Sequence, residues 1–187
     1  KKAIHHFEKI NDIPKKIVIL NNIGEAYDDI REYKLSLQYF QQVLKLAEAT
    51  KDENTILFPL FSIGNNLVKD GQYHKALEYL NRSLPIAIKV KDKRITSEIY
   101  QSIGGAYSNE KKYDLAEKNF LQSIQISDAN NYFDLLTNTL NELAKLYREQ
   151  GKTVKENEVL LKFVDANAKL NDNIHLNLVQ EVESKME

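Results

Sequence analysis

The stretch Leu20–Tyr39 reads LNNIGEAYDDIREYKLSLQY, and its skeleton returns three more times along the chain. An apolar residue, then a small residue and, three positions later, a large residue recur at a step of forty residues. The four copies are Ile23-Gly24-Tyr27, Ile63-Gly64-Leu67, Ile103-Gly104-Tyr107 and Leu143-Ala144-Tyr147. A fixed period of this size is the mark of a repeat array. The sequence therefore predicts a stack of similar units.

Each unit carries two helical patterns separated by a short turn. In the first unit, the apolar positions Ile17, Leu20, Ile23 and Tyr27 recur every three or four residues, which defines one face of a helix. A second helical pattern begins at Tyr33, after the turn Arg31-Glu32. The whole chain has only three prolines and six glycines, so few residues interrupt helices. We therefore expect an all-α fold built from helix pairs.

The forty-residue step also predicts how one domain, residues 1–187, is divided. Residues 1–12 correspond to the end of a truncated repeat, and residues 132–171 form a fourth repeat that has drifted, as terminal units do. From about Asn173 a separate last helix is expected to cap the array or to link it to a further segment. The predicted parts are 1–12, repeats 13–51, 52–91, 92–131 and 132–171, and the capping or linker helix 172–187.

Residue size explains why small residues recur at one register. Two antiparallel helices must approach closely somewhere, and glycine on the first helix of a unit permits this approach. Glycine inside a helix costs about 0.5–1 kcal/mol relative to alanine, so packing must offset it. The predicted small positions are Gly24, Gly64, Gly104 and Ala144 on first helices and Ser36, Ala76 and Ala116 on second helices, with Phe40 and Phe120 among the large partners.

These residues resemble the tetratricopeptide repeat over nearly the whole chain. The matching runs are IGEAY…EYKLSLQYF, IGNNL…QYHKALEYL and IGGAY…KYDLAEKNF, with a weaker LAKLY…KTVKENEVL. Each repeat is longer than the usual length of about 34 residues, and the lengthened form is similar to sensory or regulatory regions of bacterial signalling proteins. The resemblance implies a right-handed superhelical solenoid of antiparallel helix pairs. It also implies a concave groove lined by the first helices, which binds a protein or a peptide.

The face of each first helix beside its core stripe is the candidate groove. Amides recur there as Asn21, Gln101 and Asn141, and an amide can pair with an extended peptide backbone because it offers donors and an acceptor. Phe58 and Phe61 could form an apolar pocket for an anchoring side chain. Two alternatives stay open: the amides are merely tolerated on a solvated face, and the two phenylalanines pack against the neighbouring repeat. The candidate groove residues are Asn21, Asn22, Glu25, Phe58, Phe61, Asn65, Gln101, Asn109, Asn138, Asn141, Lys145 and Arg148.

Composition argues against several other functions. The formal charge is -1 and no stretch concentrates lysine and arginine, which speaks against nucleic acid as a partner. No apolar run approaches the roughly twenty residues that span a bilayer, so no direct membrane contact is expected. The chain has no cysteine, and its four histidines have no suggestive carboxylate partners. No phosphate-binding glycine loop or catalytic triad pattern is present. We therefore predict no enzyme activity, no cofactor and no metal.

The favoured hypothesis is a binding module that forms the sensory or regulatory segment of a larger bacterial signalling protein. A structural scaffold or oligomerisation module without its own ligand is the alternative, with a homodimer formed through the terminal helices. The cytoplasm is the expected compartment, and the periplasm stays open for a parent protein that is a membrane sensor.

Overall fold

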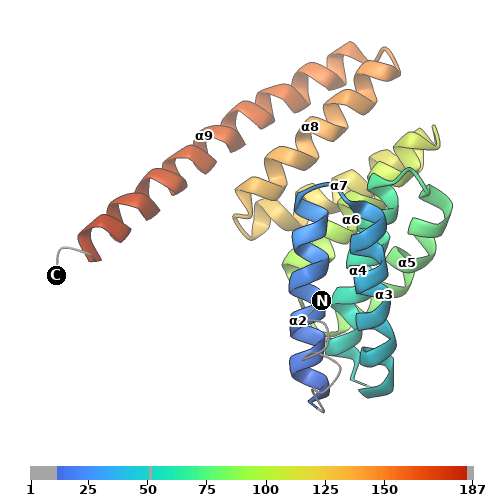
Figure 1. Ribbon diagram of the computed structural model, residues 1–187. Coiled ribbons are helices and arrows are strands. Elements are labelled where there is room, and N and C mark those ends of the chain that lie inside the picture. Colours follow the sequence, from blue (N-terminus) through green and yellow to red (C-terminus); the bar gives the residue numbers. More distant parts are fainter. Residues whose placement is uncertain (1–11, 51, 185–187) are drawn as a thin grey trace. The chain divides into compact units, whose positions relative to one another are not determined.

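The computed structural model describes residues 12–50 and 52–184, and these residues form eight helices joined by short turns (Figure 1). No strand occurs in these two ranges. The predicted all-α fold of helix pairs is therefore confirmed. The helices are α2 (Ile13–Asp29), α3 (Tyr33–Thr50), α4 (Glu53–Lys69), α5 (Tyr73–Lys89), α6 (Lys93–Asn109), α7 (Tyr113–Ala129), α8 (Phe133–Glu149) and α9 (Thr153–Ser184).

The chain divides into two compact units, Lys1–Asp92 and Lys93–Glu187. In the first unit α2 packs on α3, α3 on α4, and α4 on α5. In the second unit α6 packs on α7, α7 on α8, and α8 on α9, while α6 also touches α8. In the second unit the two first helices, α6 and α8, are therefore in contact with each other as well as with α7.

Six of the turns between helices share one hydrogen-bonding pattern, and their positions fit a step of twenty residues. After α2, the Arg31 N–H donates to the Asp28 carbonyl and the Glu32 N–H donates to the Tyr27 carbonyl, both at 2.9 Å. This pair of bonds is the Schellman motif, in which one residue takes a left-handed conformation. That residue has a positive φ of 56–78° at Arg31, Gly71, Lys91, Lys111, Asn131 and Gly151. The forty-residue repeat is thus two twenty-residue halves with the same helix ending.

The small residues permit the close approach that the sequence predicts. A Cβ atom added at Gly104 would lie 2.6 Å from Cδ1 of Phe120, and one at Gly24 would lie 2.8 Å from Cε1 of Phe40. Ser36 is fully buried, and its hydroxyl donates to the Gly24 carbonyl over 2.7 Å. The predicted packing of first on second helices is confirmed at these positions.

The separate last helix predicted from about Asn173 is wrong, because α9 continues without a break for 32 residues. The twenty-residue register would place a left-handed residue at Asn171, yet Asn171 is helical. No glycine or proline lies between Thr153 and Ser184. Asparagine and aspartate cost a helix only some tenths of a kcal/mol each. A turn at this place would need a following helix to pack back, and none follows among the described residues.

Candidate functional site

In the first unit, an ion pair joins the first helices α2 and α4. The Lys69 ammonium lies 2.5 Å from Oδ2 of Asp28 and 5.8 Å from the centre of the Tyr33 ring. Asp28 is half-buried, whereas Lys69 is exposed, so solvent reaches one side of the pair. This contact holds the C-terminal ends of α2 and α4 side by side.

On each of these two helices, polar residues precede the ion pair at helical spacing. Asn21 and Glu25 precede Asp28 at helical spacing on α2, and Asn65 precedes Lys69 on α4. The Asn21 side-chain oxygen is buried and has no hydrogen-bond partner among the described protein groups. A buried acceptor without a partner costs about 1–3 kcal/mol, so Asn21 can gain free energy from a ligand that donates a hydrogen bond. We call Asn21, Glu25, Asp28, Asn65 and Lys69 the α2–α4 strip.

The two candidate phenylalanines, Phe58 and Phe61, are largely engaged in packing. The Phe58 ring meets the Phe40 ring of α3 edge-on, with 6.3 Å between the ring centres and 75° between the planes. Phe58 is half-buried and Phe61 is buried, at 9% exposure. Phe58 therefore joins its helix to the preceding one.

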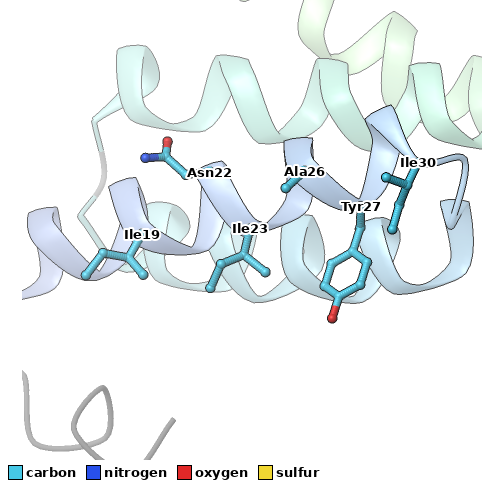
Figure 2. Close-up of a pocket in the computed structure, with 6 residues that line it drawn as sticks. All are labelled: Ile19, Asn22, Ile23, Ala26, Tyr27 and Ile30. Carbon is cyan, nitrogen blue, oxygen red and sulfur yellow. The ribbon is translucent and has the colours of Figure 1, made fainter. Parts of the chain in front are cut away.

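Asn22 lies away from the α2–α4 strip, on a different face of α2. It lines an open pocket together with Ile19, Ile23, Ala26, Tyr27 and Ile30; the first five of these six residues lie on α2, and Ile30 is its C-cap residue (Figure 2). Ile30 is 65% exposed and Ile19 is 36% exposed. We call this apolar surface the α2 face. Asn21 is next to Asn22 in the sequence but does not line this surface.

In the second unit, four of the predicted groove residues form a continuous stripe along α8. Asn138, Asn141, Lys145 and Arg148 are all exposed and follow one another at helical spacing. The two cations already have carboxylate partners, because Lys145 pairs with Glu142 and Arg148 pairs with Glu156, each at 2.7 Å. Two uncharged amides and two neutralised cations therefore face solvent along this helix.

The two candidates on α6 differ in their surroundings. Gln101 is half-buried. Asn109 is exposed, and its amide nitrogen donates to the Gly105 carbonyl of its own helix over 2.8 Å. One amide hydrogen of Asn109 therefore satisfies a backbone carbonyl near the end of α6.

Arg94 and Asp134 connect the starts of α6 and α8. The Arg94 guanidinium donates to both oxygens of the Asp134 carboxylate, lies 3.2 Å from Glu98 and lies 5.4 Å from the centre of the Tyr132 ring. Hydrogen bonding from Arg94 lowers the pKa of Asp134. The groove prediction did not include Arg94 or Asp134. Their opposite charges at a separation of forty residues are the signal that could have revealed the pair.

A second charged cluster joins α7, α8 and α9. Oε1 of Glu117 accepts from the Tyr147 hydroxyl and from the Lys155 ammonium, each over 2.8 Å, and Lys152 lies 3.9 Å from Oε2. Burial favours a raised pKa at Glu117, but hydrogen bonds from Lys155 and Tyr147 outweigh it and lower the pKa. Burial, and then the hydrogen bond to Glu117, raise the pKa of Tyr147. The sequence analysis missed this cluster, which ties three helices together.

The Glu117 cluster predicts how stability depends on pH. Because the pKa of Glu117 is lowered by folding, its contribution is present above the unfolded value of about 4.5 and is lost as the pH falls. Glu117→Gln is expected to lower the free energy of unfolding at pH 7 by about 1–2 kcal/mol, since it removes hydrogen bonds to a charged group. Urea denaturation at several pH values measures this effect.

The control for this prediction is Glu142→Gln, which removes the carboxylate of an exposed pair with Lys145. Such pairs contribute about 0–1 kcal/mol, so little change is expected. If the difference in stability between Glu117→Gln and the unchanged chain stayed the same from pH 7 down to pH 3, the assignment to Glu117 would be wrong.

The described part of the chain holds no group of three or more histidine, cysteine, aspartate or glutamate side chains placed to bind a metal ion. None of the described helices has the combination of length and apolar character needed to cross a bilayer.

Comparison with known proteins identifies the class of protein that this fold defines. The model of the tetratricopeptide repeat family matches residues 15–89 and 52–129, which together cover more than half of the chain. The chain belongs to the tetratricopeptide repeat family, so the resemblance seen in its repeats is confirmed.

Two similar curated proteins are bacterial response regulator aspartate phosphatases. The chain is 27% identical over 157 residues to response regulator aspartate phosphatase E of Bacillus subtilis (strain 168), covering 81% of this chain and 39% of that protein. It is 25% identical over 176 residues to response regulator aspartate phosphatase I of the same strain, covering 90% of this chain and 44% of that protein. The chain thus spans less than half the length of these curated relatives.

Among solved structures, the crystal structure of a Rap protein complexed with competence and sporulation factor has the same fold over this region. The TM-score is 0.81, with 22% sequence identity, and the match covers 93% of this chain and 49% of that one.

Proposed function

We propose that this chain is a protein- or peptide-binding tetratricopeptide module and the sensory or regulatory segment of a larger bacterial signalling protein. The observation that supports this proposal is the α2–α4 strip, where Asn21 presents an unsatisfied acceptor on the helix that Asp28 and Lys69 join to α4. Relatives named as response regulator phosphatases, and a related fold solved with competence and sporulation factor, support the same class of function.

The ligand that suits the strip best is an extended peptide backbone. Rotation of the Asn21 amide about its last side-chain bond turns the oxygen towards a ligand N–H, and the amide nitrogen can donate to a ligand carbonyl. Glu25 on the same helix adds an exposed carboxylate that favours a peptide with positive charge nearby. On α8, Asn138 and Asn141 offer amides of the same kind.

The role proposed for the chain is binding, with no catalytic residue assigned to it. A cytoplasmic position accords with this role, and a periplasmic one with a parent protein that is a membrane sensor. The predicted division into repeats 13–51, 52–91, 92–131 and 132–171 stays part of the proposal.

A scaffold or oligomerisation role is the second candidate, and the α2 face is the observation that favours it. Ile30 and Ile19 expose apolar surface there without a covering helix among the described residues. Buried apolar area contributes about 25 cal/mol per Å², so such a surface favours association.

Selection of peptides from a displayed random library on the full chain tests the binding role. We expect selected peptides whose affinity, measured by fluorescence anisotropy, falls about tenfold with Asn21→Ala or Asn141→Ala, because a lost hydrogen-bonding amide costs roughly 1.4 kcal/mol. The matched control is Asn119→Ala, which removes a half-buried amide from a second helix, α7, where it donates to the Leu115 carbonyl.

The outcomes separate the two candidate functions. Failure to select any peptide, or equal affinity of the unchanged chain and both first-helix variants, would count against the binding role. A stable dimer seen by light scattering, with no peptide bound, would favour the scaffold role.

A further inference from the structure

A small cleft in the second unit lies between the three helices α7, α8 and α9. Its floor is aliphatic and consists of Ile124 of α7, Leu136 and Leu140 of α8, and Ala166 of α9. The cleft has a volume of about 220 Å³. Sites for drug-sized ligands have volumes of roughly 300–1,000 Å³ and are lined mostly by apolar side chains. This cleft therefore suits a smaller ligand that carries one apolar group.

The space in the cleft comes from a small residue at position 166. At the forty-residue step, Ala166 matches Leu46, Ile86 and Ile126 of the other second helices. Alanine lacks the branched part of these side chains. The second repeat also has aliphatic residues at the other three floor positions, namely Leu44, Ile56 and Leu60. The floor of the cleft thus differs from the second repeat by the loss of one branched aliphatic side chain.

The rim of the cleft carries two opposite charges that are not joined to each other. Lys162 of α9 and Asp128 of α7 line the cleft, and both are exposed. Within residues 12–50 and 52–184, neither side chain forms an ion pair. In the second repeat, Arg82 and Glu48 stand at the same two positions and form an ion pair of 3.1 Å. The shorter aspartate and the narrower lysine head group leave the equivalent pair unmade.

The other two charged residues of the rim pair with each other. The Lys169 ammonium lies 2.7 Å from Oδ2 of Asp165, one turn earlier on α9. The hydrogen bond to Asp165 and, as a smaller effect, the charge of Asp128 raise the pKa of Lys169. The groups that the rim offers to a ligand are therefore the Lys162 cation and the Asp128 carboxylate.

We propose that this cleft binds a free branched-chain amino acid such as leucine. The branched side chain lies on the floor, the ligand carboxylate pairs with Lys162, and the ligand ammonium pairs with Asp128. A zwitterion suits the rim because the two charges have opposite signs. In the second repeat, the chain itself supplies the aliphatic group at Ile86 and satisfies both charges. The proposal is independent of the α2–α4 strip and of peptide binding.

Titration of the full chain with leucine, followed by methyl NMR, tests the proposal. We expect the methyl signals of Ile124, Leu136 and Leu140 to shift with a Kd of about 0.1–1 mM, a range suited to so small a ligand. Isocaproate lacks the ammonium group of leucine, and isoamylamine lacks its carboxylate. Each should bind at least about tenfold more weakly than leucine, because one charge of the rim then stays unpaired.

Two variants of the cleft locate the site. Ala166→Ile restores the residue found at positions 86 and 126, so it should fold, as checked by circular dichroism, and weaken leucine binding at least about tenfold. The matched control is Ala168→Ile, which adds the same group at an exposed position of α9 outside the cleft and should leave the Kd unchanged. Lys162→Gln changes an exposed side chain and should weaken binding about tenfold, which keeps the test decisive if Ala166→Ile does not fold.

Three results would overturn the proposal. The first is the absence of methyl shifts at about 10 mM leucine, well above the expected Kd. The second is equal affinity of the unchanged chain and a folded Ala166→Ile variant. The third is binding of N-acetylleucine methylamide as tight as that of leucine, because the cleft would then take a leucine side chain within a peptide instead of the free amino acid.

Discussion

Gly104→Ala is expected to lower the free energy of unfolding by about 1–3 kcal/mol, although alanine favours a helix more than glycine does. The added Cβ would lie 2.6 Å from Cδ1 and 2.8 Å from Cε1 of the Phe120 ring. Phe120 is 1% exposed, so its ring cannot move aside without disturbing its neighbours. Overpacking therefore outweighs the gain in helix propensity. Urea denaturation followed by circular dichroism measures the change.

The neighbouring Gly105 provides the matched control. A Cβ added there meets no heavy atom within 4 Å. Gly105→Ala should therefore raise the free energy of unfolding by about 0.5–1 kcal/mol, the usual gain from replacing glycine within a helix. The same substitution one residue apart thus has opposite effects. If both variants changed the free energy of unfolding by the same amount, close packing against Phe120 would not be the reason for glycine at position 104.

Phe120→Ala is expected to have the largest effect of any single change considered, a loss of about 3–5 kcal/mol. The ring fills the volume beside Gly104 and belongs to the buried cluster formed by α7, α8 and α9. In the Phe120→Ala background, Gly104→Ala should become neutral or stabilising, because the ring that its Cβ would meet is gone. A double-mutant cycle measured by urea denaturation gives this coupling directly.

Leu121→Ala is the control for the cycle. Leu121 neighbours Phe120 in sequence but is 46% exposed, so its loss should change stability by less than about 0.5 kcal/mol. If Gly104→Ala were equally destabilising with and without the Phe120 ring, another contact would have to explain the need for glycine.

The sequence predicted the helix pairs and their packing register because size and apolar character repeat at a fixed step. The sequence predicted Phe40 as one of the large partners of the small positions, and in the structure its ring lies beside Gly24, where only a small residue leaves room for it. The continuity of α9 could not be predicted, because a chain segment without glycine or proline ends its helix only if another helix packs back. Tertiary packing, which the local sequence does not contain, decides that case.

The candidate site was predicted less completely than the fold. Helical spacing identified the exposed stripe on α8, but it grouped Asn22 with Asn21, whereas Asn22 lies on the α2 face. Side-chain pairings such as Arg94 with Asp134 depend on rotamers and on the approach of two helices, which periodicity does not give. The choice of ligand is determined by the side chains between the repeated positions. Predicting the fold from the repeated positions therefore did not identify the ligand.

The twenty-residue turn register restricts how the length of such a chain can change. Removing forty residues preserves both the turns and the alternation of first and second helices. Removing only twenty residues keeps the described left-handed turn residues in register, but it substitutes a second helix for a first one, so that Ile124 stands where Gly104 is needed. Arrays of this kind can therefore lengthen or shorten only by whole helix pairs, and a half-unit exchange would leave the turns intact while destroying the core.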